Sequence, residues 1–162
     1  MYLQRKLSDK LITFKGLRYP YRTSKQSSLR YNATVGIGGN IADVKRRFEH
    51  LFFTIKRDKR VSIEATALIL KNPPFGYLNQ EDFLNSIIVL KTNLNAKEFL
   101  KYLLRLEKKF GRRRSFADAP RTLDLDIIFF NNQVINTEEL TIPHHGWAKR
   151  ESVLIPLASM CR

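Results

Sequence analysis

The chain has 162 residues, which fits one domain, and 43% of them are hydrophobic, so a core can form. No stretch reaches the roughly 20 apolar residues of a membrane-spanning helix, and the single cysteine, Cys161, excludes an internal disulfide and fits a reducing, cytoplasmic setting. The 29 lysines and arginines against 15 acidic residues give a net charge of +14, which favours anionic partners.

Residues 1–30 form a basic segment without a clear hydrophobic period. Eight of the cations and one acid, Asp9, lie in residues 1–32. From Tyr19 to Leu29 the chain is polar and contains Pro20 and three serines, a composition typical of linkers. We expect a flexible or docked basic N-terminal extension over residues 1–30 and a single domain over residues 31–162. An organelle transit peptide is a weaker alternative.

The regular part of the chain begins with a strand, a helix and two further strands. Residues 33–37 are predicted as a strand, and Asp43 suits the start of the next helix, because a carboxylate there accepts from exposed N–H groups. Apolar residues recur at helical spacing through that helix: Val44, Phe48, Leu51, Phe52 and Ile55. Residues 61–70 and 83–92 are predicted as strands, separated by the breaker Asn-Pro-Pro-Phe-Gly at residues 72–76.

A second helix and a further strand complete the pattern. Residues 95–98, Asn-Ala-Lys-Glu, resemble a capping box and predict a helix that ends near Gly111. Residues 123–130 are predicted as a strand that turns into a short partner at residues 133–135, and a last helix is expected within residues 147–160. The order β-α-β-β-α-β predicts an α+β, ferredoxin-like fold. Its helices pack on one face of a mainly antiparallel sheet, and the other face is open for a ligand.

The strongest chemical feature is the pair of carboxylates, Asp124 and Asp126, in the last predicted strand of the sheet. Side chains at positions i and i+2 share a face, and their Cα atoms lie roughly 6–7 Å apart. Both carboxylates can lean onto a cation between them, and paired metals in phosphate enzymes lie roughly 3.5–4 Å apart. The opposite, apolar face would consist of Leu123, Leu125, Ile127 and Phe129. The plainer alternative is a half-exposed strand whose outer face is merely polar.

Four arginines flank this pair: Arg112, Arg113, Arg114 and Arg121. Guanidinium groups match phosphate oxygens and can neutralise the charge that spreads over a transferred phosphoryl group. Carboxylates and arginines together predict a magnesium-phosphate site. A basic loop tip would still account for at least one of the four.

Three weaker features could bind a substrate. Phe83 and Asn85 share a strand face, where a ring and an amide could hold a flat, hydrogen-bonding heterocycle. His144 could donate to a phosphate, whereas the adjacent pair His144 and His145 does not suit a single metal. The glycines within residues 36–39 match a phosphate-binding loop incompletely, so a tight strand-to-helix turn is the better interpretation.

Taken together, these residues resemble the 6-hydroxymethyl-7,8-dihydropterin pyrophosphokinase family of folate biosynthesis. The matching motifs occur in family order: Gly38-Gly39-Asn40, Asn72-Pro73-Pro74-Phe75-Gly76, Phe83-Leu84-Asn85, Pro120-Arg121-Thr122-Leu123-Asp124-Leu125-Asp126, Pro143-His144, Arg150 and Leu154-Ile155-Pro156-Leu157. The resemblance implies a ferredoxin-like pyrophosphokinase domain over residues 31–162. It also implies transfer of the β,γ-diphosphate of ATP to the pterin hydroxymethyl oxygen, with release of AMP.

The resemblance further implies roles for individual residues. The catalytic residues would be Arg112, Arg121, Asp124 and Asp126, and the two aspartates would hold two Mg²⁺ ions. ATP, the co-substrate, would bind at Glu107, Arg112, Arg114, Arg121, Ile127, Thr141, His144 and Arg150. The pterin would bind at Pro73, Phe75, Phe83 and Asn85. The partners would be these two small molecules, with no nucleic acid and no membrane, and the protein would be a cytoplasmic monomer.

The chain departs from the family pattern around the pterin. Residues 117–119, Ala-Asp-Ala, stand where a tryptophan is usual, and Ser152 replaces a phenylalanine that stacks on the pterin. Trp147 and Phe116 are the candidate substitutes for that aromatic wall. The arginine loop is about a residue short, which leaves open which of its arginines contacts phosphate.

The competing interpretation is an RNA-binding module, because RNA-recognition motifs share this element order and are often basic. Such modules need stacking aromatics on their first and third strands. Residues 33–37 contain none, and the third strand offers only Phe83. Asp124 and Asp126 would also repel phosphate without a metal, so the enzyme is the preferred interpretation.

Overall fold

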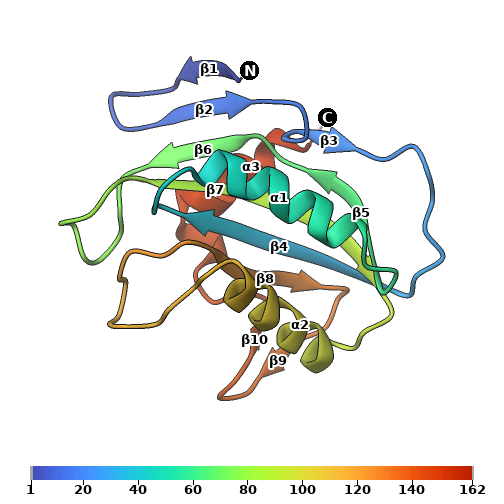
Figure 1. Ribbon diagram of the computed structural model, residues 1–162. Helices are drawn as coiled ribbons and strands as arrows, with labels where there is room; N and C mark the ends of the chain where they lie inside the picture. Colours follow the sequence, from blue (N-terminus) through green and yellow to red (C-terminus); the bar gives the residue numbers. More distant parts are fainter. Residues whose placement is uncertain (1, 162) are drawn as a thin grey trace.

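The computed structural model describes residues 2–161, and within them eight strands form one antiparallel sheet (Figure 1). The strands are β1 (Leu3–Lys6), β2 (Ile12–Lys15), β3 (Tyr21–Arg22), β4 (Tyr31–Gly39), β5 (Val61–Thr66), β6 (Ile69–Asn72), β7 (Phe83–Thr92) and β8 (Asp124–Phe130). A separate ribbon pairs β9 (Ile135–Asn136) with β10 (Thr141–Ile142). The helices are α1 (Val44–Lys56), α2 (Ala96–Lys109) and α3 (Glu151–Ser159), with a 3-10 turn η1 (Trp147–Lys149).

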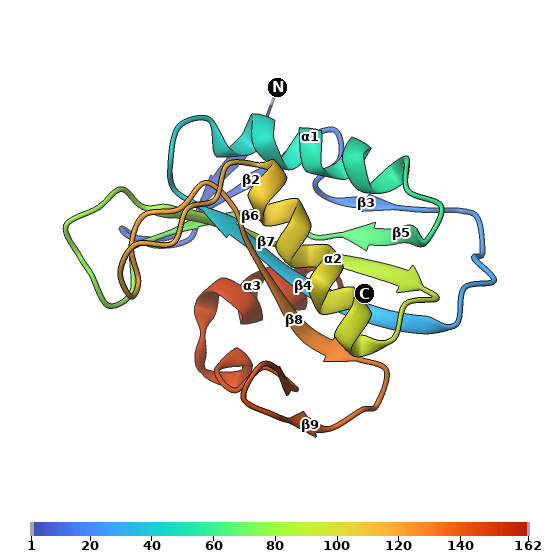
Figure 2. The ribbon, with the colours of Figure 1, turned by 60° about the horizontal axis from the view of Figure 1, so that its bottom comes forward.

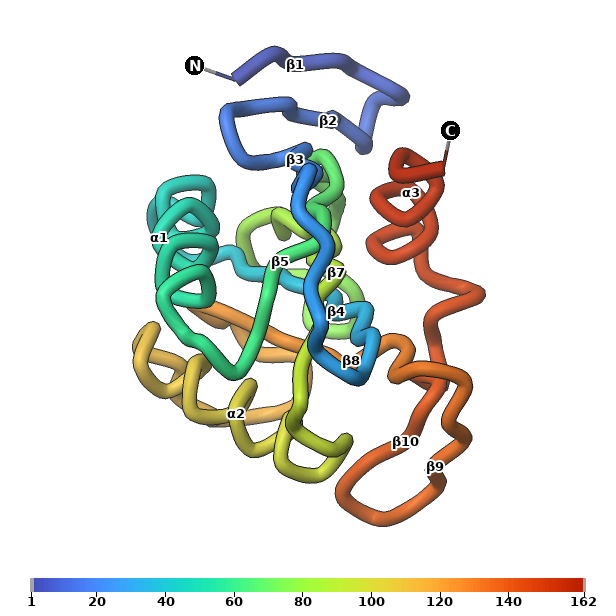
Figure 3. Tube along the Cα trace, turned by 90° about the vertical axis from the view of Figure 1, so that its right-hand side faces the viewer, coloured from blue at the N-terminus to red at the C-terminus, as the bar shows by residue number. Residues whose placement is uncertain are grey.

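From β4 onward the elements follow the predicted β-α-β-β-α-β order. β4 lies between β7 and β8, and both β5 and β6 pair with β7. Helices α1 and α2 cover one face of the sheet, whereas α3 lies on the other (Figures 2 and 3). The α+β, ferredoxin-like class is therefore confirmed. Helix α3 covers part of the second face, where Val153 packs against Ile87 and Ile128.

The starts of both long helices lie where the sequence predicts them. The side chain of Asp43 accepts a hydrogen bond from the Arg46 N–H (3.1 Å) at the start of α1. At the start of α2, the Glu98 N–H donates to the Asn95 side chain (2.9 Å) and the Asn95 N–H donates to the Glu98 side chain (3.1 Å). This reciprocal pair is the predicted capping box, and it satisfies backbone donors that a helix start otherwise leaves unpaired.

Three details of the predicted strands were wrong. Residues 61–70 form two strands, β5 and β6, separated by Ala67 and Leu68. Residues 133–135 do not pair with β8, because β9 pairs with β10. In β8 the register shifts by one residue, since Thr34 pairs with Phe129 but Val35 pairs with Ile127. This bulge turns Phe129 away from the main core and against Trp147, so Phe129 does not share a face with Leu125.

The basic N-terminal segment contributes three short strands to the sheet. Strands β1 and β2 form a hairpin that pairs with β6, and β3 pairs with β5. Tyr19 is 0% exposed, and its hydroxyl donates to the carbonyl oxygen of Phe48 (2.8 Å) on α1. The chain thus packs an aromatic residue from this segment into the core between the sheet and α1. Among residues 2–161, no helix has the length and apolar content needed to cross a membrane.

Candidate active site

Asp124 and Asp126 lie on the face of β8 that they share with Ile128, opposite the core residues Leu123 and Leu125. Asp124 is held by two arginines. Arg112 Nη1 lies 2.8 Å from Asp124 Oδ1, and Arg121 Nη1 lies 3.0 Å from Asp124 Oδ2. Both carboxylate oxygens therefore accept charge-assisted hydrogen bonds, the strong kind.

Glu107, in the last turn of α2, joins this network and is only 3% exposed. Arg112 Nη1 lies 3.1 Å from Glu107 Oε1, so one guanidinium bridges Glu107 and Asp124. Arg114 reaches the same glutamate at 3.4 Å, whereas Arg113 makes no ion pair within residues 2–161. Of the three loop arginines, Arg112 is thus the one in contact with the aspartate pair.

Negative charge is concentrated at this site. Burial, together with the charges of Asp124 and Glu107, raises the pKa of the Asp126 carboxyl from 3.8 to about 7. Burial likewise raises the pKa of Glu107, although Arg112 opposes that shift. A divalent cation would relieve this repulsion, and carboxylate oxygens are the ligands that Mg²⁺ prefers.

The donor set suits magnesium bound with a substrate. Within residues 2–161, no group of three or more His, Cys, Asp or Glu side chains gathers as a metal cage. Mg²⁺ in phosphate enzymes typically uses one or two carboxylates, with waters and substrate phosphates completing its octahedron. Two aspartates on one strand face therefore fit Mg²⁺ that arrives with a polyphosphate.

A first cavity of about 440 Å³ opens beside Asp124. Its lining includes the four residues predicted for the pterin, together with three charged residues of the site: Pro73, Phe75, Phe83, Asn85, Arg121, Asp124 and Arg150. The guanidinium of Arg121 lies 5.0 Å from the centre of the Phe83 ring, and that of Arg150 lies 5.6 Å from the centre of the Phe75 ring. Two aromatic rings and two planar guanidinium groups thus lie close together in a cavity large enough for a small molecule.

Asn85 has a fixed orientation at the floor of this cavity. Its Nδ2 donates to Asn72 Oδ1 (2.7 Å), and a Cβ on Gly38 would lie 2.5 Å from its Oδ1. Any side chain at position 38 would therefore displace the amide. Gly38 is required here because of the close approach, and Asn72 is a positioning residue that the sequence reasoning did not single out.

Neither candidate substitute for the missing aromatic wall lines this cavity. Trp147 packs edge-to-face on Phe129, with ring centres 4.9 Å apart. Phe116 packs on Tyr77 at the tips of two loops, with ring centres 5.1 Å apart. Ser152 does line the cavity, together with Asp118 from the segment where a tryptophan is usual in the family.

A second cavity, of about 540 Å³, lies at the free edge of β8 and is lined by Glu107, Arg114, Asp124 and Asp126 among others. Within residues 2–161, β8 pairs with β4 alone, so its other edge carries no strand. Burial raises the pKa of Glu107, and the Leu125 N–H, which is directed toward that carboxylate at this edge, opposes the shift. The peptide groups of Ile127, two residues on, face the same edge, while its side chain is buried in the core.

The remaining predicted ATP residues come from the C-terminal segment. The Gly146 N–H donates to His144 Nδ1 (3.1 Å), so the neutral ring of His144 carries its proton on Nε2. Burial, with help from Arg150, lowers the pKa of His144 and favours that neutral form. Arg150 lines the first cavity, whereas Thr141 is exposed on β10 and lines neither cavity.

Asn40 anchors the main chain of Arg121. The Arg121 N–H donates to Asn40 Oδ1 (2.9 Å), and the Asn40 N–H donates back to the Arg121 carbonyl (3.0 Å). Asn40 Nδ2 donates in turn to Gln80 Oε1 (2.9 Å). The prediction of a tight strand-to-helix turn at the glycines was wrong, since residues 36–39 belong to β4. Asn40 follows that strand directly, and its anchoring function was not predicted.

A comparison with known protein families identifies the family of this chain. A family model described as 7,8-dihydro-6-hydroxymethylpterin-pyrophosphokinase (HPPK) matches residues 34–162. The chain belongs to this family. The resemblance read from the Pro120–Asp126 run is thereby confirmed.

Curated members of the HPPK family align along most of their length. The chain is similar to the Campylobacter jejuni 2-amino-4-hydroxy-6-hydroxymethyldihydropteridine pyrophosphokinase, at 42% identity over 139 residues, covering 86% of this chain and 88% of the relative. Proteins of the same name from Helicobacter pylori (37% over 142 residues; 86% and 87% covered) and Bacillus subtilis (35% over 130 residues; 80% and 78% covered) are also similar.

HPPK membership identifies the reaction. The protein is an ATP-dependent pyrophosphokinase that transfers diphosphate from ATP to hydroxymethyldihydropterin in folate synthesis. The alternative of an RNA-binding module is not supported. The residues that line the two cavities are the candidates for carrying out this reaction.

Proposed function

We propose that the pterin occupies the first cavity and ATP the second, with diphosphate transferred between them over the Asp124–Asp126 pair. The observation that carries this proposal is that Asp124 lines both cavities. A two-substrate transfer needs its reacting atoms side by side, and positioning of that kind can supply a large part of the rate enhancement. The catalytic residues are Arg112, Arg121, Asp124 and Asp126.

The pterin is held by Pro73, Phe75, Phe83 and Asn85. Asn85, oriented by Asn72 and Gly38, offers a carbonyl oxygen to ring N–H groups of the heterocycle. The ring of Phe83 provides the stacking surface. The Arg121 guanidinium covers this ring, so Arg121 would leave it when the pterin enters.

ATP is held by Glu107, Arg112, Arg114, Arg121, Ile127, Thr141, His144 and Arg150. Glu107 and Arg114 line the second cavity, whereas Arg121 and Arg150 line the first and would reach the end of the triphosphate that faces the pterin. Ile127 offers the N–H and C=O of an unpaired strand edge to the polar rim of the base. His144 donates its Nε2 proton to a phosphate oxygen, because its Nδ1 is engaged by Gly146. The arginines carry the charge of the triphosphate.

Asp124 and Asp126 would hold two Mg²⁺ ions, which would supply neutralisation of the charge that develops during transfer. Arg112 and Arg121, which hold Asp124, turn to the phosphates and stabilise the leaving and transferred groups. Catalysis by this chain is then alignment and charge neutralisation, without a covalent intermediate.

The test is turnover with Mg-ATP and 6-hydroxymethyl-7,8-dihydropterin. We expect AMP, because diphosphate transfer leaves one phosphate on the nucleoside, and we expect Asp126→Asn to lose at least about 10³-fold in kcat while folding normally. Asp9→Asn, which removes an exposed carboxylate paired with Lys6, is the matched control and should be fully active. Near-normal turnover by Asp126→Asn would sink the metal assignment.

We also propose that the protein acts as a cytoplasmic monomer with no nucleic-acid or membrane partner. Both cavities and all the proposed site residues lie within one chain, so no second copy is needed to complete the site. Light scattering on the purified protein at micromolar concentration should give the mass of one chain. A stable dimer would contradict the proposal.

A further inference from the structure

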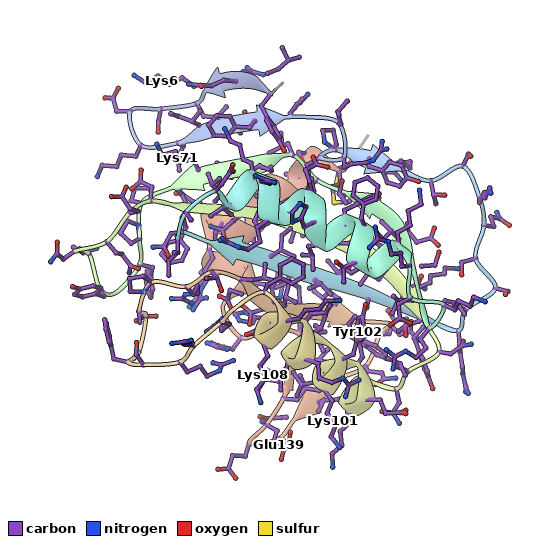
Figure 4. All side chains as sticks on the ribbon, in the orientation of Figure 1. Lys6, Lys71, Lys101, Tyr102, Lys108 and Glu139 are labelled. Carbon is purple, nitrogen blue, oxygen red and sulfur yellow. The ribbon has the colours of Figure 1, made fainter. Side chains whose placement is uncertain are left out.

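A third cavity, of about 450 Å³, lies between the C-terminal end of α1 and the middle of α2, apart from the active site. It is lined by Thr54, Arg57, Asp58, Lys59, Arg60, Tyr102, Arg105, Leu106 and Lys109. None of these residues lines either cavity of the proposed active site. Figure 4 shows Tyr102 on the side of α2 nearer α1, and Lys101 on the far side.

The only carboxylate of this lining is already engaged. Arg60 binds Asp58 through Nε (3.0 Å) and Nη2 (2.6 Å), and the Arg60 N–H also donates to Asp58 (3.0 Å). The Thr92 hydroxyl fixes the same turn by donating to the Arg60 carbonyl (2.9 Å). These hydrogen bonds hold the turn in place, and Arg60 neutralises the negative charge of Asp58.

Four other cations line the cavity and form no ion pair in the part of the chain that the structure describes. Within residues 2–161, no ion pair involves Arg57, Lys59, Arg105 or Lys109. Cations near helix C-termini suit the helix dipole, which accounts for Arg57 and Lys109. Arg105, a turn earlier in α2, gains little from the dipole, and Lys59 lies beyond the end of α1. This excess of positive charge fits an anion.

A second observation, independent of charge, also points to a ligand. Tyr102 is 3% exposed, and its hydroxyl has no hydrogen-bond partner within residues 2–161. Leaving a buried hydroxyl unpaired costs free energy, so such groups are few. The neighbouring cations are all donors and supply no acceptor. A ligand that brings negatively charged oxygen atoms would satisfy the hydroxyl and the cations together.

We propose that this cavity is a second anion site, which binds a small phosphorylated molecule away from the active site. Phosphate fits better than a single carboxylate, because its several oxygens can accept from two guanidinium groups and the tyrosine hydroxyl at once. Arg57 and Arg105 would grip the phosphate from α1 and α2, and Tyr102 would donate from below.

The test is calorimetric titration of the full-length protein with inorganic triphosphate in the absence of Mg²⁺. Arg57→Gln with Arg105→Gln should weaken one class of site by about tenfold or more and leave AMP turnover unchanged. Lys10→Gln with Lys15→Gln removes the same charge from the N-terminal hairpin and is the matched control. Equal weakening in both double variants would overturn the proposal, since it would mean that only net charge matters.

Tyr102→Phe tests the hydroxyl alone. The variant keeps the ring, so its melting temperature without ligand should not fall, while triphosphate should bind severalfold more weakly at the cavity. Citrate, a trianion without phosphorus, should bind more weakly than triphosphate to the wild type. Unchanged triphosphate affinity in Tyr102→Phe, or equal affinity for citrate, would overturn the assignment.

Discussion

At the scale of single residues, two arginines of the candidate site are engaged with one carboxylate. Arg112 and Arg121 occupy both oxygens of Asp124, and both guanidinium groups are largely buried. Without this pairing, the two arginines would attract other anions to the site. We propose that metal and triphosphate replace these partners on binding, so that each charge passes from one counter-charge to another.

Arg121→Ala tests this exchange. We expect kcat to fall by about 10³-fold or more, with a small change in the KM for ATP, because the guanidinium acts chiefly on charge that develops during transfer. Steady-state kinetics on both substrates would measure it. Arg113→Ala is the control, since Arg113 lies in the same loop without an ion pair in residues 2–161. Equal losses in the two variants would mean that the loop acts only through its net charge.

Gly38 and Gly36 offer a matched pair for the pterin side. A methyl at Gly38 would meet the Asn85 amide at 2.5 Å, whereas one at Gly36 would meet only the end of the Ile128 side chain at 3.3 Å. Gly38→Ala should therefore raise the KM for the pterin by about tenfold and leave that for ATP nearly unchanged. Gly36→Ala should change neither by more than about twofold. A pterin KM unaffected by Gly38→Ala would argue against Asn85 as a ligand.

Asp126 makes the metal-free protein sensitive to pH. Its carboxyl pKa rises from 3.8 to about 7 on folding, so the folded chain binds this proton more tightly than the unfolded chain. The stabilisation it contributes is complete below its unfolded pKa and is lost as pH rises through about 7. The melting temperature of the metal-free wild type should thus fall between about pH 4 and pH 7 relative to Asp126→Asn, and level off above that range. Parallel curves would contradict this, and Mg²⁺ should restore stability at the higher pH.

The shared face of the two carboxylates was predictable from the sequence, and the way in which the side chains of the candidate site are held was not. The i, i+2 spacing of Asp124 and Asp126 is enough to place both carboxylates on one face. The parts played by Asn40 and Asn72 depend on partners 81 and 13 residues away in the chain. An amide at or just beyond the end of a strand carries no sequence signal for such distant partners.

At the scale of elements, local sequence signals predicted where α2 and β7 begin. Features that depend on long-range strand pairing, such as the bulge in β8 and strands β1 to β3, were not predicted. The capping box fixes the start of α2, and β7 spans the residues predicted for it. The bulge in β8 was missed, because Ile127, Ile128 and Phe129 are all apolar and show no break in period. Strands β1 to β3 were missed because they are short and owe their order to pairing with β6 and β5.

The capping box predicts a measurable cost. Asn95→Ala removes the acceptor for the Glu98 N–H and should lower the free energy of unfolding by about 1 kcal/mol. Urea unfolding followed by circular dichroism would report it as a lower midpoint. Lys101→Ala, on the exposed face of α2, is the control and should change stability little. No difference between the variants would mean that tertiary packing alone sets the start of the helix.

At the scale of the whole molecule, the boundary near residue 30 remains a proposal. The family model begins at residue 34, which agrees with a domain that starts at β4. Nevertheless, β2 and β3 extend the sheet, and the aromatic ring of Tyr19 contacts Phe48 and Phe52 on α1. The basic segment therefore contributes to the core although it supplies none of the proposed site residues.

Tyr19→Ala measures that contribution. Deleting a fully buried aromatic side chain with a satisfied hydroxyl should cost about 3–5 kcal/mol of unfolding free energy. Chemical denaturation is the measurement, and kcat at a permissive temperature should be nearly unchanged. Leu17→Ala, at an 80% exposed position nearby, should be neutral. A neutral Tyr19→Ala would mean that the segment is dispensable for stability.

The N-terminal hairpin also determines which strand forms the edge of the sheet beyond β6. Without it, β6 would end the sheet with the apolar run Ile69-Leu70 and open backbone groups, a template for pairing with another chain. With it, the terminal strand is β1, whose Arg5 and Lys6 are exposed. Like charges on two approaching copies would repel, so the hairpin protects the enzyme against fibril-like association in a crowded solution.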